Sequence, residues 1–191
     1  YFSNQHRVSF DGVSYDNEDI ILYDGKNHSM FFDGSDVGLS NARIDAFAKV
    51  SDTELLFSFD APIVLQFGRV WLMIDDSDVV LFRGTQFGED TRGSFATFLW
   101  GEGVGLTRNG EDIDGIDLLP DGRLLVSVRG SFRAGGLRGA DEDIFAFTPD
   151  YPGNYIWGSW SRYFDGSDVG LSQSRGEDVD AFSVGEKEIY L

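Results

Sequence analysis

Cysteine is absent from this sequence of 191 residues, and histidine is nearly so, with only His6 and His28. The chain therefore forms no disulfide and has no thiol nucleophile. Two histidines in polar, turn-like surroundings provide little material for a Ser-His-Asp triad or a zinc site. No apolar run reaches the ~18 residues that a membrane-spanning helix needs, and no secretory signal peptide is recognisable. These absences disfavour several common catalytic and membrane-anchored classes.

Basic residues are scarce as well, because 15 lysines and arginines stand against 33 aspartates and glutamates, for a net charge of −18. Phosphate backbones and anionic lipid surfaces attract basic proteins, so we expect neither a nucleic-acid partner nor insertion into a membrane. Folding brings the carboxylates together and makes them repel one another. Divalent cations or high salt would offset that repulsion.

The chain contains an internal repeat. The nine residues Phe-Asp-Gly-Ser-Asp-Val-Gly-Leu-Ser at positions 32–40 return unchanged at positions 164–172. A diverged third copy, Phe98–Leu106, aligns without a gap to Phe31–Leu39. Repeats of this kind indicate a fold built from like units.

Two further landmarks recur with each copy of this glycine-rich stretch. One follows it and reads as the start of a strand, at positions 43–47, 112–116 and 178–182. The other precedes it and reads as an aspartate before an apolar run, at positions 19–23, 78–82 and 143–147. Between them lies a predicted hairpin, most clearly where Pro120-Asp-Gly-Arg123 separates two apolar runs. No segment has the 3.6-residue periodicity of a long helix.

These landmarks predict an all-β chain that forms a closed, pseudo-threefold ring of three four-stranded antiparallel units, similar to a three-bladed β-propeller. Residues 1–191 would form one domain, with repeats at approximately 24–82, 83–147, and 148–191 together with 1–23. In the third unit the two termini would share one strand, with Phe2 in the place of Phe59 and Val128. Such sharing removes free sheet edges. A pseudo-threefold β-barrel or prism fits the same pattern.

Aspartates recur at equivalent positions and suggest calcium, which takes six to eight oxygen ligands from short loops rich in Asp, Asn and Gly. The pair in the glycine-rich stretch occurs in two copies, and Trp100 and Gly103 replace it in the middle copy. The twelve-residue spacing of an EF-hand is absent. The candidate metal ligands are Asp33, Asp36, Asp165, Asp168, Asp19, Asp78, Asp143, Asp45, Asp114 and Asp180.

Each of these aspartates has a structural alternative, which is to accept backbone N–H groups in turns and at the starts of strands. A structural role would be repeated in every unit, as the sets at Asp19 and Asp45 are. Paired carboxylates also serve as the acid and base of glycoside hydrolases. A catalytic pair is normally single, however, whereas these acids are repeated.

An aromatic cluster around Ile156-Trp-Gly-Ser-Trp160 suggests a surface for stacking on sugar rings, with core packing as the alternative. It lies beside a loop without a full-length counterpart in the other units, and such loops often carry specificity. A second insertion, Arg129–Arg138, carries arginines that could hold an acidic ligand. The candidate ligand-binding residues are Trp157, Trp160, Tyr151, Tyr155 and Arg133.

Four motifs together resemble a repeat found in large secreted or surface-exposed bacterial proteins, most of them without an assigned activity. They are Tyr163-Phe-Asp-Gly-Ser-Asp-Val-Gly-Leu171, Glu177-Asp-Val-Asp-Ala-Phe182, Pro120-Asp-Gly-Arg-Leu-Leu125 and Asp141-Glu-Asp-Ile-Phe-Ala-Phe-Thr-Pro149. The resemblance covers essentially the whole chain. It implies an extracellular bacterial context and use of the repeat in tandem.

We therefore expect a secreted or cell-surface, non-enzymatic module that calcium stabilises and that is monomeric. Its partner would be an extracellular ligand, such as a glycan or a surface protein. A carbohydrate-active enzyme that uses the paired aspartates is one alternative. A structural spacer without any ligand is the other.

Overall fold

The computed structural model describes residues 1–185, and in this range the chain is all-β with antiparallel sheets, as predicted. One four-stranded sheet has the order β10-β9-β6-β5, and a second has the order β11-β12-β13-β14. Their strands are β5 (Ile44–Lys49), β6 (Glu54–Phe59), β9 (Val79–Gln86), β10 (Arg92–Leu99), β11 (Ile113–Leu118), β12 (Leu124–Val128), β13 (Ile144–Tyr151) and β14 (Asn154–Phe164).

Three two-stranded pairs and four short helical turns complete the described chain. The pairs are β1 (Val8–Phe10) with β2 (Val13–Tyr15), β3 (Ile20–Tyr23) with β4 (His28–Phe32), and β7 (Ile63–Phe67) with β8 (Val70–Ile74). The helical turns are η1 (Ser35–Val37), α1 (Gly101–Val104), η2 (Gly166–Val169) and η3 (Gln173–Arg175). No helix of the described residues is long and apolar enough to cross a membrane.

Burial explains which runs become central strands. β6 and β12 read Glu-Leu-Leu-Phe-Ser-Phe and Leu-Leu-Val-Ser-Val, and every residue of both is buried except Glu54. Strands covered on both faces are continuous apolar runs, whereas β5 alternates buried and half-buried residues. The serine inside each run is buried and hydrogen-bonded: Ser58 Oγ donates to the Asp78 carbonyl at 3.2 Å, and Ser127 Oγ donates to Asp114 Oδ1 at 2.8 Å.

In the structure, the first two units are the sheets β5-β6-β9-β10 and β11-β12-β13-β14, each with the glycine-rich loop that follows it. The third consists of residues 178–185 and β1–β4 and forms no four-stranded sheet among the described residues, so the prediction of three such sheets is met only twice.

The three units nevertheless share one feature. Each contains a hairpin insert that is closed at its base by one pair of residues. The first residue of that pair lies five residues after a serine, and the second lies four residues before an aspartate. The serines are Ser3, Ser58 and Ser127, the aspartates are Asp19, Asp78 and Asp143, and the pairs are Val8↔Tyr15, Ile63↔Ile74 and Phe132↔Gly139.

This equivalence corrects the predicted register of the N-terminal segment. Phe2 pairs with Ile21, two residues beyond Asp19, as Phe57 pairs with Val80 and Val126 with Phe145. Phe2 therefore stands in the place of Phe57 and Val126, and the prediction of Phe59 and Val128 was wrong by two residues. A two-residue shift keeps every side chain on its face, so the alternation of the sequence could not reveal it.

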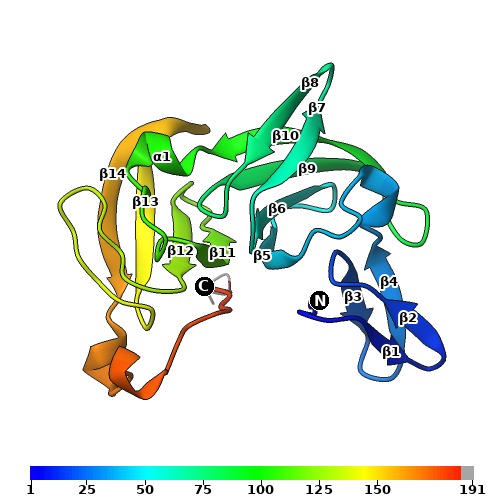
Figure 1. Ribbon diagram of the computed structural model, residues 1–191, viewed down its shortest axis with the longest axis horizontal. Coiled ribbons are helices and arrows are strands. Elements are labelled where there is room, and N and C mark those ends of the chain that lie inside the picture. The colour runs from blue at the N-terminus through cyan, green and yellow to red at the C-terminus, as the bar shows by residue number, and fades with distance from the viewer. Residues whose placement is uncertain (186–191) are drawn as a thin grey trace, which may run out of the picture.

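Figure 1 shows the two four-stranded sheets side by side, with β5 and β11 innermost. The β1–β4 segment lies at the lower right, and the residues that follow β14 lie apart from it at the lower left. Residues 178–184 run along β11, where the Val184 N–H donates to Asp117 Oδ2 at 2.7 Å. None of the sheets formed by residues 1–185 closes into a barrel. The predicted strand shared by both termini involves Ile189–Leu191, which lie outside the described residues.

Each unit is joined to the preceding one by the same hydrogen bond. The N–H groups of Ile44, Ile113 and Val179 donate to the carbonyls of Asn17, Asp76 and Asp141 at 3.2, 3.0 and 3.0 Å. These carbonyls all lie two residues before the aspartates at 19, 78 and 143. Residues 178–184 thus occupy the position of an innermost strand of a third unit.

Candidate functional site

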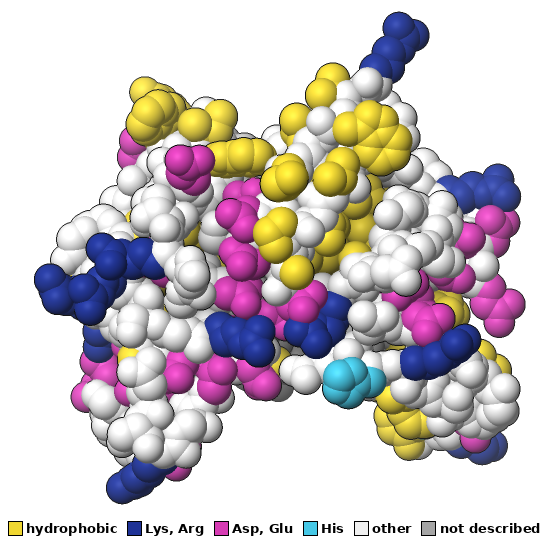
Figure 2. Space-filling model, in the orientation of Figure 1, with side chains coloured by type: hydrophobic (Ala, Val, Ile, Leu, Met, Phe, Trp, Pro, Cys, Tyr) yellow, Lys and Arg dark blue, Asp and Glu magenta, His cyan; other side chains and the backbone are white. Residues whose placement is uncertain are grey.

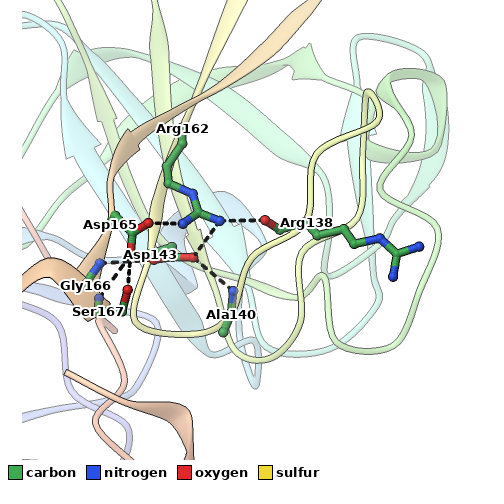
Figure 3. Close-up of polar contacts among 7 residues, drawn as sticks. All are labelled: Arg138, Ala140, Asp143, Arg162, Asp165, Gly166 and Ser167. Carbon is green, nitrogen blue, oxygen red and sulfur yellow. Dashed lines mark hydrogen bonds and ion pairs between the residues drawn. The ribbon is translucent and has the colours of Figure 1, made fainter. Parts of the chain in front are cut away.

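One predicted aspartate set has a structural role that is the same in every unit. Asp143 is buried, and its two carboxylate oxygens accept the N–H groups of Gly166 at 3.0 Å and Ala140 at 3.1 Å (Figure 3). Asp19 accepts from Gly34 and Asp16 in the same way, and Asp78 accepts from Gly101 and Asp75. Burial raises the pKa of both Asp19 and Asp78. The set at 19, 78 and 143 therefore fastens each glycine-rich loop to the turn before the third strand of its own unit.

The glycine beside this carboxylate has a physical reason of its own. A Cβ atom on Gly166 would lie 2.2 Å from the Glu142 carbonyl oxygen, and the same contact would be 2.3 Å at Gly34 and 2.4 Å at Gly101. These distances are far below a van der Waals contact. The close approach explains why the middle unit keeps this glycine although it has lost the aspartates on either side.

The aspartates inside the glycine-rich loops do not converge on a common point, because each binds partners close to it. Asp33 accepts the N–H and hydroxyl of Ser35, and Asp165 accepts those of Ser167 and also pairs with Arg162 (Figure 3). Asp36 accepts the Thr91 N–H at 2.8 Å, whereas Asp168 is exposed. In residues 1–185, no three His, Cys, Asp or Glu side chains are close enough to hold a metal ion.

The third aspartate set comes together at the centre of the molecule. Asp45, Asp114 and Asp180, one from each unit, line a single cavity of about 660 Å³. Figure 2 shows acidic side chains gathered at the centre of the face that it presents. The wall is made by the innermost segments and the N-terminus, and consists of Tyr1, Phe2, Ser3, Gln5, Ile44, Asp45, Ala46, Phe47, Ala48, Lys49, Asp114, Gly115, Ile116, Asp117, Asp180, Ala181, Phe182 and Ser183. We call this space the axial cavity.

A β-bulge positions the carboxylate in both complete sheets. The pairing of β5 with β6 shifts register at Asp45, and the pairing of β11 with β12 shifts at Asp114. A bulged residue leaves the hydrogen-bonding ladder and its side chain is re-aimed. Two residues further on, Phe47, Ile116 and Phe182 add an apolar side chain to the same wall.

Crowding of carboxyl groups shifts the pKa values beside the axial cavity. Burial raises the pKa of Asp114 to about 8, with additional repulsion from Asp178, Asp45 and Asp112. The hydrogen bond from Ser127 lowers the pKa but does not offset these effects. Burial and repulsion from Asp45 and Asp76 raise the pKa of Asp112 to about 7, although Arg129 lies 3.5 Å away. Neither Asp114 Oδ2 nor Asp112 Oδ1 has a hydrogen-bond partner among residues 1–185.

Asp112 and the phenylalanines of the cavity wall were not predicted as site residues from the sequence. A signal for Phe47 and Phe182 was present, because each stands two residues after a repeated aspartate and alternate residues of a strand share a face. Asp112 had no comparable signal, since Arg43 occupies its position in the first unit.

The predicted aromatic cluster is split by the fold. Trp160 and Tyr155 are 8% and 5% exposed, and their polar atoms donate to the Val104 and Gly122 carbonyls at 2.9 and 2.8 Å. They therefore belong to the core, which is the alternative that the sequence left open. Trp157 and Tyr151 are 66% and 68% exposed at the end of the β13–β14 hairpin. Arg133 is exposed in the second insert, where its own N–H donates to Glu111.

Comparison of the chain with protein-family models, with curated proteins and with solved structures finds no match.

Proposed function

We propose that this protein is a secreted or cell-surface binding module, not an enzyme, and that its ligand occupies the axial cavity. The observation that carries the proposal is the convergence of one repeated aspartate from each unit on the wall of one cavity. Ligand pockets have mostly apolar walls and a few polar groups that fix orientation. The bacterial context remains an inference from the resemblance of its motifs.

A raised pKa in a cavity is also what the general acid of a glycoside hydrolase requires. Asp114 has such a pKa, but it is only 4% exposed and one of its oxygens is occupied by Ser127. A proton donor has to come within hydrogen-bond reach of the substrate oxygen. The enclosure of Asp114 therefore favours binding over hydrolysis.

We propose further that the three units form a closed, propeller-like ring, with β1–β4 docked against residues 164–177. The glycine-rich loops support this, because Leu39 and Leu106 are each 1% exposed, whereas Leu171 is half-buried and Val169 is 65% exposed. Two of the three loops are covered by a neighbouring unit. The third presents the same sequence as the first without such a cover.

Glu177 supports the same closure. Its equivalent, Glu111, is fully buried, and its carboxylate accepts the N–H groups of Thr107, Arg108 and Arg133. The last of these partners comes from the hairpin insert of its own unit. Glu177 Oε2 has no partner among residues 1–185, and β1–β2 is the corresponding insert of the third unit.

An engineered disulfide tests the closure in this cysteine-free chain. At the closed junction, a Cβ on Gly105 would lie 3.5 Å from the Ala134 Cβ, which is within the range for a disulfide. The equivalent pair is Gly170 and Phe10. The double variant Gly170→Cys/Phe10→Cys is expected to oxidise within the monomer, with Gly105→Cys/Ala134→Cys as the control. Both glycines have φ above 90°, so circular dichroism first checks that each variant folds. Oxidation of the control alone would contradict the ring.

We propose that calcium stabilises the module, because −18 charges on 191 residues repel one another when the chain folds. An ion that binds only the folded chain raises its stability by RT ln(1 + [L]/Kd). The melting temperature is therefore expected to rise with calcium and to fall with chelator. An unchanged melting temperature over both additions, at constant ionic strength, would remove calcium from the account.

The ligand is tested with immobilised glycans and extracellular proteins, using a fluorescently labelled chain. Asp180→Asn alters the cavity wall, Trp157→Ala alters the exposed aromatic end of β13–β14, and Asp150→Asn is a control for the loss of one exposed charge. Loss of binding in Asp180→Asn alone supports the axial cavity, and loss in Trp157→Ala alone moves the site to the hairpin end. Release of sugar would favour the enzyme, and a complete lack of binding would favour the spacer.

A further inference from the structure

The axial cavity combines two kinds of wall that rarely occur together by chance. Four aspartates line it, Asp45, Asp114, Asp117 and Asp180, against a single basic residue, Lys49. Aromatic rings line it as well, namely Tyr1, Phe2, Phe47 and Phe182. Carboxylates attract positive charge through space, and the faces of aromatic rings attract it through their quadrupoles.

Asp114 gives the acidic wall an unmet requirement. Asp114 is only 4% exposed and lines the cavity. Its Oδ2 has no hydrogen-bond partner among residues 1–185. The charged groups nearest to it are Asp45, Asp112 and Asp178, and Ser127 is its hydrogen-bond donor. Arg129 lies 3.5 Å from Asp112 and also acts, with Arg43, on Asp45. A positive charge that enters the cavity would give the second oxygen of Asp114 a partner.

The spacing of the carboxylates favours a large cation over a metal ion. A divalent metal needs several oxygen atoms at 2.0–2.6 Å from one point, and no three such side chains converge anywhere in residues 1–185. An alkylammonium group is wider and less strongly hydrated, and its charge is attracted by carboxylates several ångströms apart. Its methylene or methyl groups also pack against aromatic and aliphatic walls.

We propose that the axial cavity binds an organic cation of the alkylammonium class, held by Asp45, Asp180 and the field of Asp114, and packed against Phe47 and Phe182. This inference rests on the proposed binding function and names the chemical class of its ligand.

Calorimetric titration with choline tests the proposal, with 3,3-dimethylbutan-1-ol as the neutral probe of the same shape. Choline is expected to bind at least tenfold more tightly than the alcohol. Asp180→Asn and Phe182→Leu are each expected to weaken choline binding about fivefold or more, a difference of about 1 kcal/mol. Asp150→Asn is the control and is expected to bind as the unaltered chain does.

Several results would overturn the proposal. These are equal binding of the alcohol, no saturable heat up to about 10 mM choline, full binding by Asp180→Asn, or displacement of choline by millimolar calcium at constant ionic strength. Circular dichroism melting of each variant separates a lost site from a lost fold. If another ligand binds and Asp180→Asn abolishes that binding while choline does not bind, the binding function stands and the alkylammonium class is rejected.

Discussion

Asp143 accepts the backbone N–H of Gly166 at 3.0 Å across 23 residues of sequence, and the same bond joins Asp78 to Gly101 and Asp19 to Gly34. One carboxylate and one glycine thus define the junction within each of three units. The bond recurs in the middle unit, where the neighbouring aspartates have been lost, so it is a constant feature of the repeat. The stability of each unit should depend on it.

Gly166→Ala should destabilise the protein by about 1–3 kcal/mol, because the new Cβ would meet the Glu142 carbonyl oxygen at 2.2 Å and the backbone would have to move. Gly185→Ala is the matched control, since a Cβ there meets no atom within 4 Å and its φ is not in the left-handed region. Urea titration gives both free energies of unfolding. Equal effects of the two variants would mean that the close approach is not a constraint.

Asp78→Ala should cost about 2–4 kcal/mol, because the buried N–H of Gly101 and the partly buried N–H of Asp75 would both lose their acceptor. Asp90→Ala removes an exposed aspartate that pairs with Arg92 at the surface, and should change stability by less than about 1 kcal/mol. Thermal unfolding with and without calcium should rank the variants identically. A calcium response that vanishes only in Asp78→Ala would instead make Asp78 a metal ligand.

Stability should fall with rising pH through the range in which Asp112 and Asp114 ionise. Their pKa values in the folded protein are raised to about 7 and about 8, against roughly 3.9 for an unfolded aspartate. Above about pH 4 the unfolded chain therefore binds fewer protons than the folded chain at these sites, so the contribution is fully present below about pH 4 and is lost as pH rises to 8.

Asp114→Asn isolates this effect from the other acidic groups. Relative to the unaltered chain, the variant should become progressively more stable between pH 4 and pH 8, because asparagine keeps the acceptor for Ser127 and cannot ionise. Free energies of unfolding at four or five pH values measure the difference. A constant or shrinking difference would show that Asp114 is ionised in the folded protein.

Replacing Trp157 and replacing Trp160 should have very different effects on the stability of the protein. Trp160→Ala should cost about 3–5 kcal/mol, because the side chain is 8% exposed and fills the core between Phe132 and Phe147. Trp157→Ala should leave stability nearly unchanged, since that ring is 66% exposed. Chemical unfolding followed by fluorescence of the remaining tryptophans measures both. Similar costs would contradict this placement of β14.

How much the sequence could foretell differs between parts of the molecule. Exact repetition of residues 32–40 at 164–172 was enough to predict like units, because identical local sequences make identical turns. It could not assign roles to the aspartates, since both Asp143 and Asp180 recur and only packing separates a backbone acceptor from a cavity wall. The burial of Trp160 and exposure of Trp157 likewise depend on which side of β14 packs against α1 and the core.

The register of Phe2 was out of reach for a different reason. Apolar alternation tolerates a two-residue slip. Only the hairpin insert that follows shows that Ser3 is the equivalent of Ser58 and Ser127. The insert in the first unit is longer than the others, so the equivalence becomes visible only when the outermost pairs of the three hairpins are known.

A crystal structure of the chain is the strongest test of whether three like units present their repeated aspartates to one axial cavity. In that structure, Asp45, Asp114 and Asp180 are expected to line one cavity, and the Val179 N–H is expected to donate to the Asp141 carbonyl. A structure with residues 178–184 paired elsewhere, and with Asp180 outside that cavity, would contradict it.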